Sequence, residues 1–589
     1  MNHTALQLLL AGIVVLPLVG ALAALLPAPP GLRGKNPDQA VLRHGVTVTG
    51  AVLAAAIALA VGFDHARPAR MQATTDISWI PALDIRIHLG VDGISLPLVV
   101  LTALLTFLCA LYCYFHPPVT HHRPSKEAQG AARASGGPSP KAFVALLLML
   151  EAGTLATFAV LDLMLFFLAF EMVLIPMYFL IARWGGAQRQ AAAWKFILYT
   201  LLGSVVMLLG LLLIGVKSGT FDMVALATDN GPKAQLSHTV QLLAVLAIGL
   251  GLAVKSPMWP LHSWLPDAHT AAPTVGSVLL AGVLLKMGTY GFVRIALPIT
   301  PEGMHTFAPY LAALAAVGIL YGSLACLALV RKGAGGDLKR LIAYSSVGHM
   351  GFVLLGIATM TPTGVNGALF ANIAHGLITG LLFFLVGALK DRTGSTDLDT
   401  LARSGGLRPA ASGAAALLPA PSGAALYARA PRFGGLLAFG AVASLGIPGL
   451  AGFWGEMLAM FGAFRPAAGL SRPAFLTFMV MAGLGTLLTA AYLLLVVRRV
   501  CMGGTVDLAG AAVLGATDPA ATGDGNPAGK GGAAKDGTPA AVPVLPDLAR
   551  YEYAAWSPLA VLTVLAGLWP AALLGLSDPA VQQLLGGGK

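Results

Sequence analysis

The sequence predicts an all-α membrane protein with about fourteen transmembrane helices. Three observations support this fold class: 57% of the residues are hydrophobic, only 10% are charged, and the mean hydropathy is +0.79. A soluble chain carries roughly a quarter charged residues. A chain this apolar cannot cover its surface with polar groups, so we expect the lipid bilayer to be the solvent for most of it.

Apolar runs long enough to cross a bilayer recur along the whole chain. A transmembrane helix needs about 20 mostly apolar residues. The predicted spans are 5–26, 46–63, 95–115, 142–161, 163–183, 195–216, 237–257, 272–297, 308–330, 338–358, 367–389, 434–462, 475–500 and 556–576. No Lys or Arg precedes the first run, so we expect a membrane helix there and not a cleaved signal peptide.

The basic residues predict how the helices are oriented. Lys and Arg gather in the loops after the first, third, fifth and ninth spans, with Arg465 and Arg472 as the exception to this pattern. By the positive-inside rule these loops face the cytoplasm, which places both termini outside. We therefore attribute the net charge of +11 to orientation in the cell membrane and to anionic lipid, and expect no nucleic acid partner.

Three segments have compositions typical of linkers. Residues 116–141 are rich in Pro, Ser and Gly, residues 408–432 in Ala, Pro and Gly, and residues 503–545 in Gly, Ala, Asp and Lys. All three fall in loops predicted to be cytoplasmic and lack periodic apolar residues. We expect them to be mobile linkers.

Two of the predicted spans carry signals for a break. Lys255 lies in AVKSPMWPLHSWLPDAH, which contains three prolines, and Glu456 follows ASLGIPGLAGFW, which contains Gly and Pro in succession. Proline removes a backbone donor and clashes with the preceding turn, so both helices are expected to unwind locally. One interrupted helix in each half is typical of paired repeats with ion sites at the breaks. Simple proline kinks are the alternative.

Four ionisable residues stand within apolar runs: Glu171, Lys255, Lys286 and Glu456. Each ionised group at a helix centre costs on the order of 2.5–3.5 kcal/mol on insertion scales. Fixed ion pairs between helices, or side chains that reach the membrane interface, would also explain single cases. Four such groups, two of them at predicted breaks, favour a functional interpretation, which is a path for protons.

Three histidines supply further titratable groups: His262, His349 and His375. A single histidine in an apolar helix is more often a hydrogen-bonded core residue, but three between the lysines and Glu456 suit a hydrated relay. A pair of Glu171 with Lys255 would keep the lysine charged while the two lie together, and separation would favour release of its proton. Three other carboxylates were expected near helix ends and are not part of this path: Glu151, Asp162 and Asp267.

Motifs for cofactors are missing from the sequence. The four cysteines form no CxxC or Cys/His cluster with metal or iron–sulfur spacing, and we expect free thiols and no metal. No GxGxxG after a strand and no P-loop lysine motif occurs. We expect no cofactor in this chain, so partner subunits or another ion gradient must supply the energy.

Five stretches resemble the antiporter-like subunits of respiratory complex I, the proton-pumping NADH:quinone oxidoreductase, and in particular subunit M, the equivalent of mitochondrial chain 4. They are DLMLFFLAFEMVLIPMYFLIARWGG, AVKSPMWPLHSWLPDAHTAAPTVGSVLLAGVLLKMGTYGFVR, DLKRLIAYSSVGHMGF, FANIAHGLITGLLFFLVGAL and ASLGIPGLAGFWGEM. The resemblance implies that Glu171, Lys255, Lys286 and Glu456 occupy proton-path positions. His262, His349 and His375 fall within matching segments.

The resemblance also implies an organisation of the chain. Its domains would be N-terminal helices over 1–115, two inverted five-helix repeats over 142–297 and 308–500, each with a broken helix, and a last helix over 556–576. The chain would belong to an enzyme without holding a redox site, and its partners would be the other membrane and peripheral subunits, especially neighbouring antiporter-like ones. The short C-terminal end and Glu456 fit subunit M better than subunit L.

Two other functions share this ancestry. One is a subunit of a multi-subunit sodium/proton antiporter, and the other is a membrane subunit of an energy-converting hydrogenase. The stretch PDAHTAAPTVGS and the region of Glu456 favour the complex I subunit over the antiporter.

Overall fold

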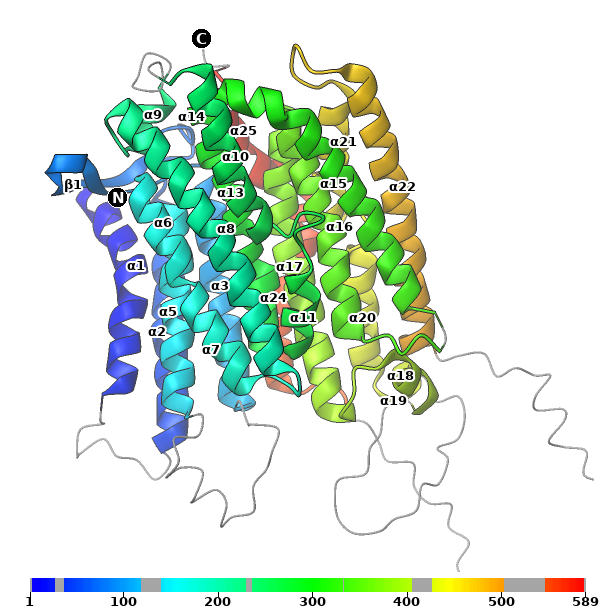
Figure 1. Cartoon of the computed structure of the whole chain (residues 1–589). Coiled ribbons are helices and arrows are strands. Elements are labelled where there is room, and N and C mark those ends of the chain that lie inside the picture. The colour runs from blue at the N-terminus through cyan, green and yellow to red at the C-terminus, as the bar shows by residue number, and fades with distance from the viewer. Residues whose placement is uncertain are drawn as a thin grey trace, which may run out of the picture.

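The computed structural model describes residues 3–26, 37–117, 139–228, 236–331, 333–404, 426–502 and 546–586. Helices stand side by side as an upright bundle (Figure 1). Most of the segment predicted at 116–141, most of 408–432, and all of 503–545 lie outside the described residues, so their interpretation as linkers stays a prediction.

Within the described residues, twelve helices are long and apolar enough to cross a membrane. They are α1 (His3–Leu25), α2 (Pro37–Gly62), α3 (Ser95–Phe115), α5 (Pro140–Ala159), α6 with α7 (Leu163–Met172 and Leu174–Trp184), α8 (Arg189–Ser218), α10 (His238–Lys255), the span from α12 to α14 (Thr274–Ile299), α15 (Pro301–Leu329), α16 (Leu338–Ala358), α17 (Pro362–Thr393), and α22 with a π-turn (Arg472–Cys501). The all-α membrane fold is thereby confirmed, while the count of fourteen stays a prediction.

Both predicted breaks are present. The helix α10 ends at Lys255, and eight residues separate it from α11 (Trp264–Ala271). A similar interruption separates α20 (Pro431–Ala443) from α21 (Ala451–Phe464). The first break leaves the Val254 carbonyl without its helical donor, and Trp264 Nε1 donates to it at 3.0 Å. Unwound backbone at membrane depth is tolerated only inside protein or against a wet cavity.

The last predicted span, 556–576, is bent in the structure. The helix α24 (Arg550–Leu568) ends earlier, and α25 (Ala571–Leu584) leaves it at an angle of 67°. The cause is Pro570, because a proline has no N–H and disfavours helical geometry at the residue before it. Trp569, which precedes it, has φ −129° and ψ 66°.

A β-hairpin beside the beginning of α1 was not predicted. Strands β1 (Gln72–Ile80) and β2 (Ile85–Val91) pair antiparallel through a short turn, η2 (Pro81–Leu83), and project from one side of the bundle (Figure 1). The hairpin is held to the bundle by His88, whose Nδ1 lies 2.5 Å from Asp222 Oδ2, and by the Arg86 N–H, which donates to Asp162.

One local motif occurs twice, at opposite ends of the bundle. Asp162 begins α6 and forms an isolated antiparallel bridge with Asp222, which begins the short helix α9 (Met223–Ala227). Asp337 begins α16 and bridges in the same way to Asp397, which precedes α18 (Leu398–Ser404). The helices α9 and α18 lie at opposite ends in Figure 1. This recurrence supports the predicted pair of inverted repeats, whose full extent stays a prediction.

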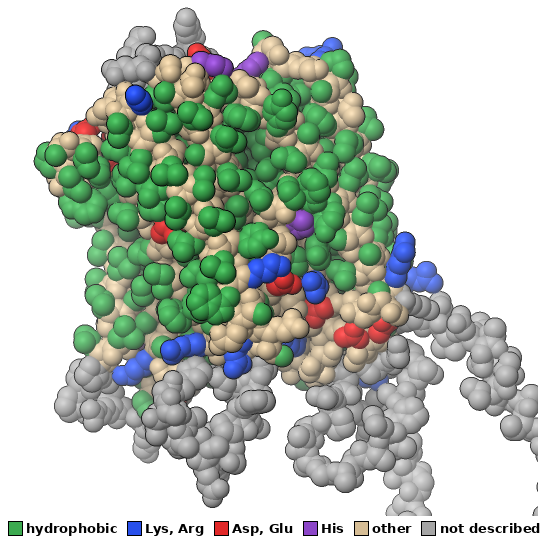
Figure 2. Space-filling model, viewed as in Figure 1, with side chains coloured by type: hydrophobic (Ala, Val, Ile, Leu, Met, Phe, Trp, Pro, Cys, Tyr) green, Lys and Arg blue, Asp and Glu red, His purple; other side chains and the backbone are tan. Residues whose placement is uncertain are grey.

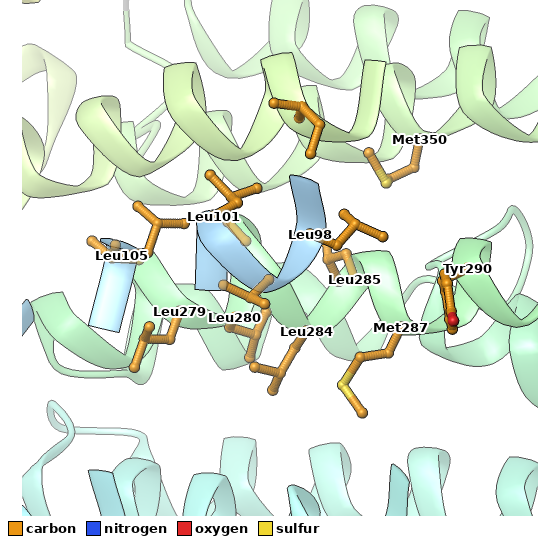
Figure 3. Close-up of a cluster of buried hydrophobic side chains, with 14 of the residues drawn as sticks. Leu98, Leu101, Leu105, Leu279, Leu280, Leu284, Leu285, Met287, Tyr290 and Met350 are labelled. Atoms are coloured by element: carbon orange, nitrogen blue, oxygen red, sulfur yellow. The ribbon is translucent and has the colours of Figure 1, made fainter. Parts of the chain in front are cut away.

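The core lies around the α12–α14 span and α17. In the most apolar 18-residue segment of Thr274–Ile299 every residue is buried, and in the corresponding segment of Pro362–Thr393 94% of the residues are buried. Leu98, Leu101 and Leu105 of α3 pack against leucines of the α12–α14 span (Figure 3). The outer surface is largely hydrophobic, and Lys and Arg gather toward one end (Figure 2). Lipid-facing side chains therefore surround two enclosed central helices.

The docking of the hairpin is expected to depend on Asp222. Burial acts to raise the pKa of Asp222, but hydrogen bonds from His88 and from the Ala225 N–H outweigh it and hold the pKa below its ordinary value. A depressed carboxylate pKa contributes stability above about pH 4, and this is lost as the pH falls through the lowered value.

Asp222→Ala should therefore loosen the hairpin at neutral pH. The lost hydrogen bond is worth about 1.5 kcal/mol, so the amides of 72–91 should exchange with deuterium roughly tenfold faster. Hydrogen exchange read by mass spectrometry measures this, with Asp64→Ala in an exposed pair with Arg67 as control. Unchanged exchange in the Asp222 variant would show that other contacts hold the hairpin.

Candidate functional site

Lys286 lies at the centre of the bundle with 0% of its surface exposed. It stands in α13 (Leu285–Gly291), between the π-turns η4 (Leu280–Leu284) and η5 (Phe292–Ala296). Its Nζ donates to the Ala281 carbonyl at 2.5 Å and lies 2.7 Å from His375 Nδ1 of α17. A π-turn changes which carbonyls are bonded within the helix, and such turns are frequent at functional sites.

The contact with His375 continues to Glu456 through a second histidine. The rings of His375 and His349 lie 5.8 Å apart between centroids. His349 Nδ1 is 2.9 Å from Glu456 Oε1, and its Nε2 is 2.9 Å from Ser444 Oγ. A cavity of about 20 Å³ lies among these side chains, which is enough for one water molecule. Four predicted residues thus form one nearly continuous line.

The second helix break places the far end of this line. Ser444 caps α20 and Glu456 lies on α21, so His349 is bonded to both sides of the break. Gly446 has φ +72°, and a Cβ on it would lie 3.1 Å from Glu456 Oε2. Glycine is required there because other residues rarely adopt that backbone conformation.

Glu171 and Lys255 do not form the predicted closed pair in this structure. Lys255 is 1% exposed, and its Nζ has no hydrogen-bond partner and lies 4.8 Å from the ring centroid of Phe170. Glu171 Oε1 is also buried and has no hydrogen-bond partner. Glu171 and Lys255 interact electrostatically, but these two described residues form no hydrogen bond or ion pair with each other. The two charged side chains are therefore not paired with each other in this structure.

The backbone of α13, which carries Lys286, packs closely against the end of α10, which carries Lys255. A Cβ on Gly288, two residues after Lys286, would lie 2.3 Å from Ser256 Oγ and 2.7 Å from the Leu252 carbonyl. Ser256 follows Lys255, and its hydroxyl is buried and unpaired. Glycine at position 288 therefore lets α10 end directly against α13.

His262 is not part of the line of contacts from Lys286 to Glu456. Its ring packs against Tyr321 at 4.9 Å and Tyr344 at 6.3 Å between centroids, and no hydrogen bond from it to the line of Lys286 to Glu456 is present in the described residues. Its predicted role in proton transfer stays a prediction.

Sequence reasoning missed His269 and misplaced Glu151. His269 on α11 is fully buried, has two unpaired ring nitrogens, and stacks on Phe383 at 4.4 Å between centroids. Glu151 is 1% exposed with both oxygens unpaired, because α5 extends to Ala159 and places it in mid-helix, not near an end. The signal for His269 was a second histidine seven residues after His262, in the same matching stretch of sequence.

The other two excluded carboxylates behave differently. Asp162 caps α6, as expected of a residue near a helix end. Asp267 on α11 forms ion pairs with Lys195 at 2.7 Å and Arg340 at 3.2 Å, which connect this half-helix to α8 and α16.

The unpaired groups gather along the same region. Buried polar atoms in proteins normally have a partner, which can be ordered water. The buried side chains with a free polar atom include Glu171, Lys255, Ser256, His262, His269, Asn372 and His375. These residues lie on α6, α11 and α17 and at the first helix break. Within the described residues, no group of three His, Cys, Asp or Glu could hold a metal ion.

Comparison with known proteins assigns the family. Residues 160–418 match the family model described as NADH:quinone oxidoreductase/Mrp antiporter, TM. The chain is 36% identical to NADH-quinone oxidoreductase subunit M of Rhodobacter capsulatus over 587 residues, covering 98% of this chain and 96% of that one. The chain belongs to the subunit M family of NADH-quinone oxidoreductase. NADH-ubiquinone oxidoreductase chain 4 of Marchantia polymorpha is 34% identical over 84% of this chain and 86% of its own length.

Solved structures agree with this assignment. A chain of respiratory complex I from Thermus thermophilus with bound NADH superposes with a TM-score of 0.71 and 27% identity, over 98% of this subunit M chain and all of that chain. A chain of the Mrp complex from Dietzia sp. DQ12-45-1b superposes with a TM-score of 0.72 and 22% identity over 99% and 98% of the two chains, which shows a shared fold.

A larger residue at position 288 should push α10 away from α13. In Gly288→Ala the new methyl group meets backbone and Ser256, so we expect a loss of about 1–3 kcal/mol of stability and a lower thermal midpoint of the purified protein. Gly483→Ala on α22 is the control, since a Cβ there has nothing within 4 Å. Equal midpoints for both variants would contradict the close packing described here.

Proposed function

We propose that this subunit carries protons across the membrane along a path through Glu171, Lys255, Lys286, His375, His349 and Glu456, with His262 and His269 beside it. The observation that carries the proposal is the line of contacts from Lys286 to Glu456. Titratable groups held within hydrogen-bond reach, or one water apart, can pass protons in sequence. Quinone reduction in partner subunits supplies the energy.

The opposite charges of Glu171 and Lys255, at the start of the path, set its direction. When Glu171 approaches Lys255, the pair keeps the lysine protonated, and the separated arrangement favours transfer of its proton toward Lys286. A proton on Lys286 faces His375, and His349 relays it to Glu456. Each transfer breaks one N–H bond and forms another N–H or O–H bond, so no other reactant is needed.

The subunit is proposed to hold no cofactor of its own and to work in the inner cytoplasmic membrane with both termini outside. Support for the orientation comes from the Lys and Arg residues that gather toward one end of the bundle (Figure 2). Buried acidic and basic residues within one bundle suit proton transfer, whereas the sequence contains no motif for binding NADH. Its neighbours in the complex are proposed to be antiporter-like subunits and the peripheral redox subunits.

Sodium/proton exchange is the second candidate. The likeness to a chain of the Mrp complex concerns the fold alone. Sodium dependence of transport by the isolated complex distinguishes this candidate from redox-driven proton transfer.

Two substitutions test the proposed path. Glu171→Gln removes the switching charge and Lys286→Ala removes the central carrier, so both should abolish proton translocation and strongly lower coupled NADH oxidation, while the complex still assembles. Translocation is measured in membrane vesicles from an indicator of internal pH, and assembly by native electrophoresis. Glu302→Gln, an exposed carboxylate at the start of α15, is the matched control. Normal translocation by both assembled variants would refute the path.

A further inference from the structure

Lys339 is the third buried lysine of the described residues, after Lys255 and Lys286, and the proposed path does not use it; only 2% of its surface is exposed. It stands in the first turn of α16, two residues after the capping residue Asp337. Its Nζ donates to the Ala272 carbonyl at 2.7 Å, at the point where α11 ends. An ammonium group has three donors. A buried lysine beside a half-helix is costly, and such groups in membrane proteins are functional candidates by default.

The surroundings of Lys339 connect it to one end of the bundle. Lys390 and Asp391, in the last turns of α17, lie within electrostatic range, as does Asp337 on its own helix. Tyr112 donates to Asp391 at 3.0 Å. These groups lie where α16 begins and α17 ends, next to α18 in Figure 1. That end carries the loops predicted to face the cytoplasm.

His269 lies within electrostatic range of both Lys339 and Lys286. The charges of both Lys339 and Lys286 act on its ring. The parallel stack on Phe383 fixes the ring plane, and both nitrogens are buried and unpaired, so each is available to accept or donate a proton. Asp267 on the same half-helix is paired with Lys195 and Arg340, which holds α11 against α16 and keeps His269 near Lys339.

We propose that Lys339 is the intake residue at the cytoplasmic end, and that it passes protons through His269 to Lys286. In the first step an N–H bond of the Lys339 ammonium breaks and an N–H bond forms on a ring nitrogen of His269, directly or through water. In the second step that proton moves to the neutral amine of Lys286, and Lys339 takes a new proton from the aqueous phase. This inference rests on the proposed function, since it feeds the same central lysine.

Three substitutions at Lys339 separate proton transfer from a structural role. Arginine keeps the charge and can still donate to Ala272, but it does not release its proton. Methionine removes charge and donor, and histidine restores a group that exchanges protons near neutral pH. We expect K339R and K339M to lower proton translocation by about tenfold or more. K339H should keep much of it, with a rate that rises as the pH on the cytoplasmic side falls from about 8 to 6.

The measurement uses the complete complex in membrane vesicles, with translocated protons counted per NADH oxidised. Assembly is checked by native electrophoresis and by NADH oxidation with a water-soluble acceptor. Lys217→Met, an exposed lysine at the end of α8, is the matched control and should behave as the unaltered protein. If K339M does not assemble, the comparison of K339R with K339H still shows whether Lys339 must exchange protons.

Each outcome has one meaning. Full translocation by K339R, or by all three variants, would overturn the inference, because charge or packing alone would then suffice. An inactive K339H beside an active K339R would overturn it as well. Lys286→Ala is measured in parallel: if it also translocates normally, the proposed function fails, whereas its loss together with an active K339R refutes only the role of Lys339.

Discussion

The free-energy cost of polar groups in hydrocarbon organises this molecule. Lipid offers no hydrogen bonds, so the backbone must satisfy itself in helices, and any interruption has to be enclosed by protein. The two interruptions lie beside α13, α16 and α17, which are among the most enclosed elements of the bundle. The same enclosure lowers the local dielectric, which makes each buried charge sensitive to its neighbours. The same enclosed centre therefore stabilises the interrupted helices and makes the buried charges responsive to one another.

The breaks and the charges depend on each other. Because α10 ends at Lys255, the lysine side chain stands at a helix terminus and the last carbonyl groups of the helix have no helical donor. The absence of a side chain at Gly288 lets α13 pack directly against this end. The break before Glu456 brings Ser444 and the carboxylate to the two nitrogens of His349. In both places an irregular segment places a titratable group that a continuous helix would have directed elsewhere. Each break costs free energy, and each places one residue of the proposed proton path, Lys255 or Glu456.

The sequence predicted the membrane class, the two breaks and the central charges, because apolar length, proline and charge within apolar runs are local signals. It could not predict that Lys286 bonds His375 while Lys255 and Glu171 stay apart, since these contacts depend on helix packing. The hairpin was missed because a search for long apolar runs does not detect short strands. The bend at Pro570 was missed because apolar residues continue on both sides of it.

The most direct test of the account is the number of protons translocated per NADH by the complex carrying His375→Leu. His375 contacts Lys286 on one side and faces His349 on the other, so leucine fills its volume while removing the relay. The account predicts a lower proton count, or a loss of coupled turnover, in a fully assembled complex. An unchanged count at normal turnover would contradict it, and would show that protons bypass the line from Lys286 to Glu456.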